Sequence, residues 1–405
     1  MNILKFSIMD YNKNLALFSF FIIFWGYVLY NFVLLFFSVP AFLGGYFGFV
    51  SSLIFCLYLI SIKFILVDVF KSSVFFAFCS VSCFLIALVS TLVSLLYPKL
   101  YYASIQSFEM LIYWFTFFAL GFYFPLVDKV WLKKTSILLV YLFFIYSIYY
   151  VYTESKLMLP FGTDEVENES ISGYQGISRS IFIIGLFIIS FSKKNIYLYI
   201  NISILAFLLF IIGSRSEFYA YIIAVTLYHL IISIKEKATF FMLCLIFSLF
   251  FFLYIANYEY ISQSRQFNVF SLNSDESWIL REQMKDLAIT QIYNNPFFGQ
   301  FGGHMEFYKG SNYTGSYIHN LLSGYVNYGF IFLILFSILC YISFIYSVNR
   351  LYKNLNDQDW IFAFLLAFVV AFLVSTTKPV FWTMTYLSWG VFIGTLYKKR
   401  AISQD

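Results

Sequence analysis

The sequence predicts an all-α polytopic integral membrane protein, and three features of its composition predict it. Of the 405 residues, 61% are hydrophobic, 24% are aromatic and only 11% are charged. An ordinary soluble domain has about a quarter of its residues charged. Hydrophobic runs also recur along the whole chain rather than at one end. A soluble enzyme with a single membrane anchor is therefore excluded.

Net charge and cysteine usage exclude two other classes of protein. The net charge is +5, from 25 basic and 20 acidic residues, and we attribute it to membrane orientation because no nucleic-acid motif accompanies it. The five cysteines all fall inside apolar runs, so neither a disulfide framework nor a CxxC metal site is predicted. The first apolar run, 15–37, is too long for a cleavable signal and is expected to stay as a span.

A helix needs about 20 apolar residues to cross the hydrocarbon core, and about twelve runs meet this length. They are 15–37, 42–62, 73–96, 106–126, 135–153, 177–192, 196–213, 216–234, 238–257, 318–347, 360–377 and 380–397. With a cytoplasmic N-terminus, 16 of the 25 basic residues fall on the inner side. Every inner loop then satisfies the positive-inside rule, so both termini are expected in the cytoplasm.

Two outer segments are long enough to have a role outside the membrane. Residues 154–179 form an acidic loop, for which a mobile linker or a contact to sugar hydroxyls or a cation are both open. Residues 258–317 form the large outer loop. It divides the chain into residues 1–257, with nine spans, and residues 318–405, with three spans and a cytoplasmic tail.

The large outer loop is expected to contain an amphipathic helix over roughly 275–293, lying on the outer membrane surface. Its apolar side chains recur at helical spacing: Leu280, Met284, Leu287, Ala288 and Ile292. Asn294-Asn295-Pro296 ends this helix, and the glycines that follow predict a tightly turned loop. These glycines are Gly299, Gly302, Gly303 and Gly310.

Arginines on the outer face are the first candidates for a site, because four of the six lie there while most lysines lie inside. Arg215 lies in a polar hinge between two spans, where it either binds an anion or anchors the interface by pairing with Glu217. Arg281 lies on the predicted amphipathic helix, with a surface ion pair as its simpler interpretation. Arg265, before that helix, is a weaker candidate. A guanidinium binds phosphate through two parallel hydrogen bonds.

His319 is the candidate for proton transfer. It begins a span after the glycine-rich loop and is followed by Asn320, which places a ring nitrogen at the mouth of an outward cavity. Histidine titrates near neutral pH and can take a proton from a sugar hydroxyl. His304 is the other outer histidine, and two histidines fall two ligands short of a metal site. We therefore expect a metal-free, cofactor-free site for an anionic lipid phosphate, whose departure is coupled to attack by a hydroxyl.

These motifs resemble those of the Wzy-type O-antigen polymerases, which are related to the O-antigen ligases, and the resemblance covers mainly 196–347. The matching segments are Gly213-Ser214-Arg215, Trp278-Ile-Leu-Arg281, Asn295-Pro296-Phe-Phe-Gly299-Gln-Phe-Gly302, His319-Asn320 and Gly329. Phe332 stands where the ligase branch has a second glycine, and the interval from Asn320 to Gly329 is one residue shorter than in that branch. Both departures favour polymerase over ligase.

The resemblance implies a metal-independent glycosyltransferase of the bacterial inner membrane with a periplasmic active site. It would transfer oligosaccharide from an undecaprenyl-pyrophosphate carrier to the end sugar hydroxyl of another lipid-linked repeat unit. Arg215 and Arg281 would neutralise the leaving pyrophosphate, and His319 would orient or deprotonate the acceptor hydroxyl. Residues expected to bind substrate beside them are Arg265, Asn320, His304 and Glu217. The implied partners are the lipid bilayer and a chain-length regulator in the membrane.

Two other functions remain open at this point. A ligase would perform the same chemistry with lipid A-core as the acceptor. A flippase for lipid-linked oligosaccharide should place charged residues inside its helices along a central path. The predicted cationic residues gather at interfaces instead, which favours an enzyme. A membrane protein without any site would leave the glycine-rich loop and the His319-Asn320 helix start unexplained.

Overall fold

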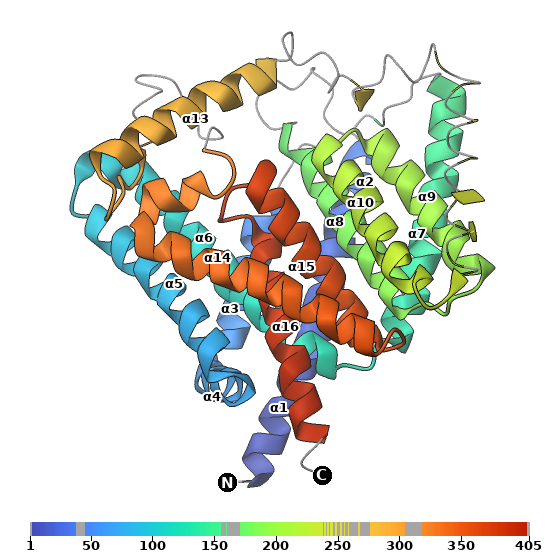
Figure 1. Ribbon diagram of the computed structural model, residues 1–405, viewed down its shortest axis with the longest axis horizontal. Helices are drawn as coiled ribbons and strands as arrows, with labels where there is room; N and C mark the ends of the chain where they lie inside the picture. Colours follow the sequence, from blue (N-terminus) through green and yellow to red (C-terminus); the bar gives the residue numbers. More distant parts are fainter. Residues whose placement is uncertain are drawn as a thin grey trace.

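The computed structural model describes residues 2–37, 45–154, 159, 171–237, 276–303 and 318–402, with isolated residues between 239 and 267. All regular secondary structure in these parts of the chain is helical. The helices are α1 Asn2–Phe20, α2 Tyr27–Phe37, α3 Tyr46–Leu59, α4 Ile62–Ser72, α5 Val74–Ser94, α6 Tyr101–Tyr123, α7 Val130–Glu154, α8 Ile171–Phe191, α9 Ile196–Ile212, α10 Arg215–Ser233, α13 Glu276–Asn294, α14 Leu322–Lys353, α15 Gln358–Thr376 and α16 Thr383–Ile402. Figure 1 shows a helical bundle with α13 across one end, the α13 end, and both termini at the other, the terminal end.

Eight of the described helices are long and apolar enough to cross a membrane, which confirms a polytopic membrane protein. The pair α3 and α4, in the region of the predicted span 42–62, passes the same test together but is bent by 83°. Helix α9 coincides with the predicted span 196–213 but has only 17 residues. Helix α16 occupies most of the predicted span 380–397 and is not one of the eight. Most of 238–257 lies outside the described residues, so a count of twelve spans stays a prediction.

The centre of the bundle is the pair of α6 and α16, and glycines allow their backbones to touch. A Cβ atom at Gly390 would lie 2.3 Å from the carbonyl oxygen of Phe118, and one at Gly394 would lie 2.0 Å from that of Phe122. Small residues permit such close packing between helices in membranes, where burial of apolar surface gives little driving force. Helices at the rim instead present apolar side chains outward, as Ile145 of α7 does with 62% of its surface exposed.

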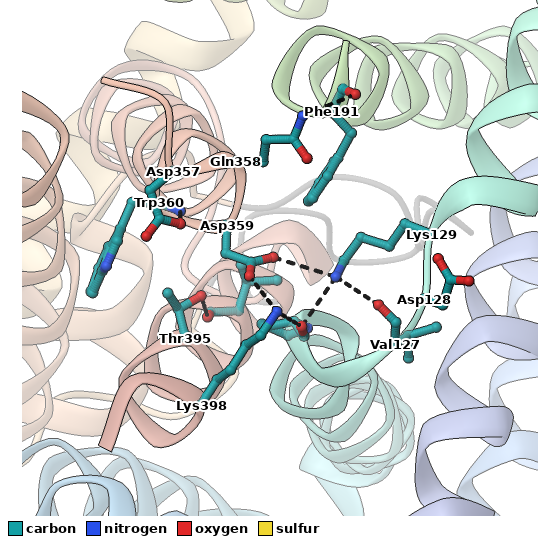
Figure 2. A network of polar contacts seen from close by, with 12 residues as sticks. Val127, Asp128, Lys129, Phe191, Asp357, Gln358, Asp359, Trp360, Thr395 and Lys398 are labelled. Carbon is teal, nitrogen blue, oxygen red and sulfur yellow. Dashed lines mark hydrogen bonds and ion pairs between the residues drawn. The ribbon is translucent and has the colours of Figure 1, made fainter. Parts of the chain in front are cut away.

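The terminal end is held together by a network of ion pairs around Asp359 (Figure 2). One oxygen of Asp359 lies 3.3 Å from Lys129 Nζ and the other lies 2.7 Å from Lys398 Nζ. Both lysines also donate to the carbonyl oxygen of Pro125, at 3.1 and 2.8 Å. Burial lowers the pKa of Lys129 to about 8, and the charge of Asp359 opposes that shift. The network joins the segment after α6 to the start of α15 and the end of α16.

A pocket of about 470 Å³ opens beside this network, and its charges are met by groups within the chain. Lys399 pairs with Asp357 at 2.6 Å, and Lys133 donates to the carbonyl oxygen of Phe191 at 3.1 Å. The Phe191 carbonyl, at the end of α8, also accepts from the side chain of Gln358. We therefore interpret the terminal end as a clamp on helix ends rather than as a ligand site.

Asp359→Asn should lower the free energy of unfolding by about 3 kcal/mol, because it leaves two neighbouring amines without their shared carboxylate. Thermal unfolding in detergent, followed by tryptophan fluorescence, measures the change. Asp10→Asn is the matched control, since the Asp10–Lys13 pair is partly exposed at the surface and surface pairs contribute less than about 1 kcal/mol. Equal melting temperatures for the two variants would contradict the clamp.

Helix α13 confirms the predicted helix at 275–293 and packs against the start of α14. Ala288 is buried in a small cluster with Ile318 and Val326. Met284 is also buried, whereas Leu280 is 36% exposed, so the buried face begins one turn later than the apolar spacing indicated. The apolar face therefore contacts protein, and a position of α13 on the membrane surface stays a prediction.

The glycine-rich segment after α13 fits into a bend of α14. Gly329 has φ of +82° within α14, and a Cβ atom there would lie 2.3 Å from the carbonyl oxygen of Phe297. Gly299 has φ of +71°, and its Cβ would lie 2.3 Å from the carbonyl oxygen of Val326. Only glycine adopts this backbone without strain and leaves room for such contact. The two glycines thus allow the chain after α13 to pack directly against the first part of α14.

Candidate functional site

Five residues at the α13 end come from four parts of the chain, and we call them the α13-end site. They are Arg215, Glu217, Arg281, His319 and Lys378. The first two begin α10, Arg281 lies in the second turn of α13, His319 precedes α14, and Lys378 lies between α15 and α16. Glu217 pairs with Lys378, and His319 lies close to Arg281 and Lys378, while Arg215 begins α10 two residues before Glu217. Four of the five were predicted from the sequence, and Lys378 was not.

An ion pair between Glu217 and Lys378 anchors the site. Helix α9 ends at Ile212, and Gly213, with φ of +89°, turns the chain sharply so that α10 starts at Arg215. Glu217 in the first turn of α10 is fully buried, and its Oε1 lies 2.8 Å from Lys378 Nζ. The hydroxyls of Ser214 and Ser216 both donate to its Oε2. Glu217 thus holds a cation and the helix start in place, and substrate binding by it stays a prediction.

Lys378 brings a cationic group into a largely enclosed position. Only 9% of its surface is exposed. Besides its contact with Glu217, its Nζ lies 5.9 Å from the centre of the Trp382 ring. Because the Glu217 carboxylate carries one negative charge, this pair is neutral in sum. Arg215 and Arg281 add two further guanidinium groups to the site.

His319 is held in a defined orientation next to these cations. Its Nδ1 lies 2.8 Å from the carbonyl oxygen of Thr377. A carbonyl only accepts hydrogen bonds, so Nδ1 carries the proton and Nε2 carries the lone pair. Burial, and then the charges of Arg281 and Lys378, lower the pKa of His319 to about 4, against the opposing effect of the Thr377 bond. The imidazole is therefore neutral at pH 7, in the form that accepts a proton.

Asn320 positions His319 and links two elements. It has φ of +61°, which asparagine tolerates better than most residues. Its side chain accepts a hydrogen bond from the Leu322 amide at 2.9 Å, and its carbonyl accepts one from the Ser323 hydroxyl at 2.7 Å. The same hydroxyl accepts from the Val380 amide at 2.9 Å. These bonds fasten the start of α14 to the segment that carries Thr377 and Lys378.

Arg215 lies partly exposed at the start of α10, one turn before Tyr219. The Tyr219 hydroxyl is close enough to be influenced by the Arg215 charge and donates to the carbonyl oxygen of Gln266 at 2.8 Å. The Gln266 side chain donates in turn to the carbonyl oxygen of Phe210 at 3.0 Å. These contacts join Gln266 to the last turn of α9 and to the beginning of α10, the helix that starts at Arg215. The predicted residues Arg265 and His304 themselves lie outside the described residues.

Two functional candidates escaped the sequence reasoning. Lys378 precedes Pro379 between two apolar runs, on the predicted outer face. Most lysines are predicted on the inner face, so Lys378 could have been singled out in the same way as the outer arginines. Arg179 was assigned to the end of the outer acidic loop, but it lies inside α8, within the span Gly173–Phe191. Among the described residues no group of three or more histidine, cysteine or acidic side chains is arranged to hold a metal ion.

The α13-end site has the components for acid-base chemistry on an anion. A neutral imidazole lies beside the cationic groups of Arg281 and Lys378, and buried contacts hold the imidazole and the Lys378 ammonium in place. Comparison of the sequence with models of protein families and with curated proteins gives no match in either case. The assignment of the site therefore depends on its geometry and chemistry.

Proposed function

We propose that this protein is a membrane glycosyltransferase that polymerises a surface polysaccharide such as O-antigen. Its donor is an oligosaccharide on a polyprenyl pyrophosphate such as undecaprenyl pyrophosphate, and its acceptor is the end sugar hydroxyl of another lipid-linked repeat unit. One arrangement carries the proposal: His319, oriented by the Thr377 carbonyl, lies beside the cationic groups of Arg281 and Lys378, whose charges lower its pKa. A base that must stay unprotonated next to an anion-binding group is what such a transfer requires.

The proposed reaction uses each group of the site once. The acceptor hydroxyl oxygen attacks the anomeric carbon of the donor sugar, and its proton passes to Nε2 of His319. The bond from the anomeric carbon to the pyrophosphate oxygen breaks, and its electron pair leaves with the pyrophosphate. Arg215, Arg281 and Lys378 stabilise the charge that develops on this leaving group. Asn320, Ser323 and Glu217 keep the reacting groups in place.

The proposed orientation follows the charge distribution. The terminal end carries Lys129, Lys133, Lys398 and Lys399 around one pocket, and lysines of this kind favour the cytoplasmic side. The α13 end then faces the periplasm of a bacterial inner membrane, and both termini are cytoplasmic. We also propose that the chain crosses the membrane about twelve times and that a chain-length regulator binds it in the membrane.

A flippase is the second candidate, and Arg179 is the observation that favours it. A charged residue within a span is expected along a path for a polar substrate. The three cations and the histidine of the α13-end site, however, lie together at one end rather than along the depth of the bundle. This grouping favours the enzyme. A ligase shares the chemistry of the site and differs only in its acceptor.

Deletion of the gene in its host, followed by size analysis of the surface glycan on a gel, separates these functions. A polymerase predicts lipid A-core capped by a single repeat in place of a ladder of long chains. Uncapped core with polymer still on its lipid carrier would mean a ligase, and loss of capped core together with outward-facing precursor would mean a flippase. Complementation with Arg215→Ala should give no ladder at normal membrane levels. Arg350→Ala, an exposed arginine at the end of α14 on the terminal side, should restore it.

A further inference from the structure

Arg179 lies within α8, inside the span Gly173–Phe191. It is the ninth residue of α8, so it lies about 12 Å along the axis from Ile171, the first residue of that helix. The surrounding span, Gly173–Phe191, is among the most enclosed, with 89% of its residues buried. Ionisable residues in such positions are costly and are retained for pairing or for a ligand.

Arg179 lacks a carboxylate partner among the residues that the structure describes. Its Nε is buried without a hydrogen-bond partner, and no described acidic side chain comes within ion-pair distance of it. Its guanidinium carbon lies 5.8 Å from the centre of the Phe47 ring, an interaction that offsets only part of the cost of desolvating a charge. This differs from the terminal end, where Asp359 and Asp357 compensate the lysines around the pocket.

The side chains around Arg179 come from three other helices, and with it they form what we call the Arg179 cluster: Tyr27, Phe47, Glu109, Tyr113 and Arg179. The centroids of the Tyr27 and Phe47 rings are 4.4 Å apart. Both tyrosine hydroxyls are close enough to be influenced by the Arg179 charge. The Tyr113 hydroxyl donates to the Glu109 carboxylate.

Part of the Arg179 cluster lies at the surface of the bundle. Glu109 is exposed and Arg179 is partly exposed, whereas Tyr27 and Tyr113 are buried behind them. Glu109 lies eight residues after the start of α6, as Arg179 does in α8, so both lie about 12 Å along their helices. A Cβ atom at Gly48 would lie 3.1 Å from a Glu109 oxygen, so the start of α3 packs directly against this carboxylate.

We propose that the Arg179 cluster binds an acidic sugar of the glycan, with its carboxylate on Arg179. Glu109 lies in the cluster but is not paired with Arg179, so a neutral sugar would leave the guanidinium without a directly bound carboxylate, whereas a carboxylate matches a guanidinium in bidentate geometry. The Glu109 carboxylate accepts hydrogen bonds from hydroxyls of the same sugar, and the partly exposed Phe47 ring contacts the apolar face of the sugar ring. A pyrophosphate, with more negative charge, fits the α13-end site better, since that site brings more than one cationic group together.

This inference rests on the proposed function for the identity of the ligand as a sugar, but its test does not depend on polymer formation. Saturation-transfer NMR on the purified protein in detergent measures binding of methyl glucuronide, with methyl glucoside as the neutral probe. We expect binding of the glucuronide alone. Arg179→Gln should weaken glucuronide binding at least tenfold. Arg179→Lys should weaken it less, because lysine keeps the positive charge but cannot make the two parallel hydrogen bonds of a guanidinium. Arg350→Gln, at the terminal end, is the matched control and should bind as the wild type does.

Three results would overturn the inference. They are equal binding of glucoside and glucuronide, unchanged glucuronide binding in Arg179→Gln, and displacement of glucuronide by inorganic phosphate at lower concentration than by free glucuronate. Thermal unfolding shows whether each variant is folded. If Arg179→Gln is unfolded, the binding test uses Arg179→Lys instead. A host deletion that leaves the glycan ladder intact would reject the proposed function while the binding result stands by itself.

Discussion

His319→Ala should lower the rate of polymer formation by about 10²- to 10⁴-fold, the usual contribution of a positioned general base. The Nδ1 contact to the Thr377 carbonyl fixes the ring so that Nε2 holds the lone pair. Without this base the acceptor hydroxyl would have to lose its proton to water in a partly buried site. The measurement is the initial rate with lipid-linked repeat units in membrane vesicles, with product sizes read from a gel.

The pH dependence of the same rate should identify His319 as the base. The neutral imidazole is the active form and its pKa is about 4, so the rate should stay level from pH 8 to about 5. It should fall only as the pH approaches 4, rather than near the ordinary histidine value of about 6.5. Arg281→Gln removes one of the charges that lower this pKa, so the fall should move to higher pH.

His229 provides the matched control, because it is the other histidine in the described part of the chain. It lies in α10 with its Nδ1 2.8 Å from the carbonyl oxygen of Val225, within the same helix. His229→Gln should retain polymer formation and the same pH profile. Wild-type rates from His319→Ala, or an acid fall near pH 6.5 in the wild type, would contradict the assignment of His319 as the base.

Local signals in the sequence were enough to predict most of the helices. Apolar runs of about 20 residues correspond to eight described helices that can cross a membrane. The helix predicted at 275–293 appears as Glu276–Asn294, because its periodic apolar residues and the Asn295-Pro296 stop are both local features. Of the predicted motif residues, Arg281 and His319 lie close to each other, while Arg215 lies at the start of α10, and the role of all three in a site stays a prediction.

Pairings between distant segments could not be predicted in this way. The sequence reasoning set Arg215 beside Glu217 as a possible ion pair, but Glu217 pairs with Lys378 from the far end of the chain. Periodicity indicates which face of a helix is buried, but it does not identify the residue opposite. The bend of α14 at Gly329 and the position of Arg179 within α8 likewise depend on how helices pack, which the spacing of residues along one helix does not record.

Lys378→Met should destabilise the protein by about 3 to 5 kcal/mol and abolish polymer formation. It leaves the Glu217 carboxylate buried without its cation, and an uncompensated buried charge costs about this much. Glu217→Gln should destabilise by a similar mechanism, because Lys378 is then the buried charge without a partner. Thermal unfolding in detergent and the gel ladder measure the two effects separately.

The double variant Glu217→Gln with Lys378→Met separates the structural role of the pair from its proposed role in catalysis. Neither buried charge remains, so stability should recover by about 1 to 3 kcal/mol relative to the sum of the single changes. Polymer formation should stay absent, because the ammonium that stabilises the leaving pyrophosphate is still missing. Strictly additive destabilisation would contradict the pairing. A double variant that folds and restores the ladder would show that Lys378 serves the fold alone, leaving Arg215 and Arg281 as the cations for the leaving group.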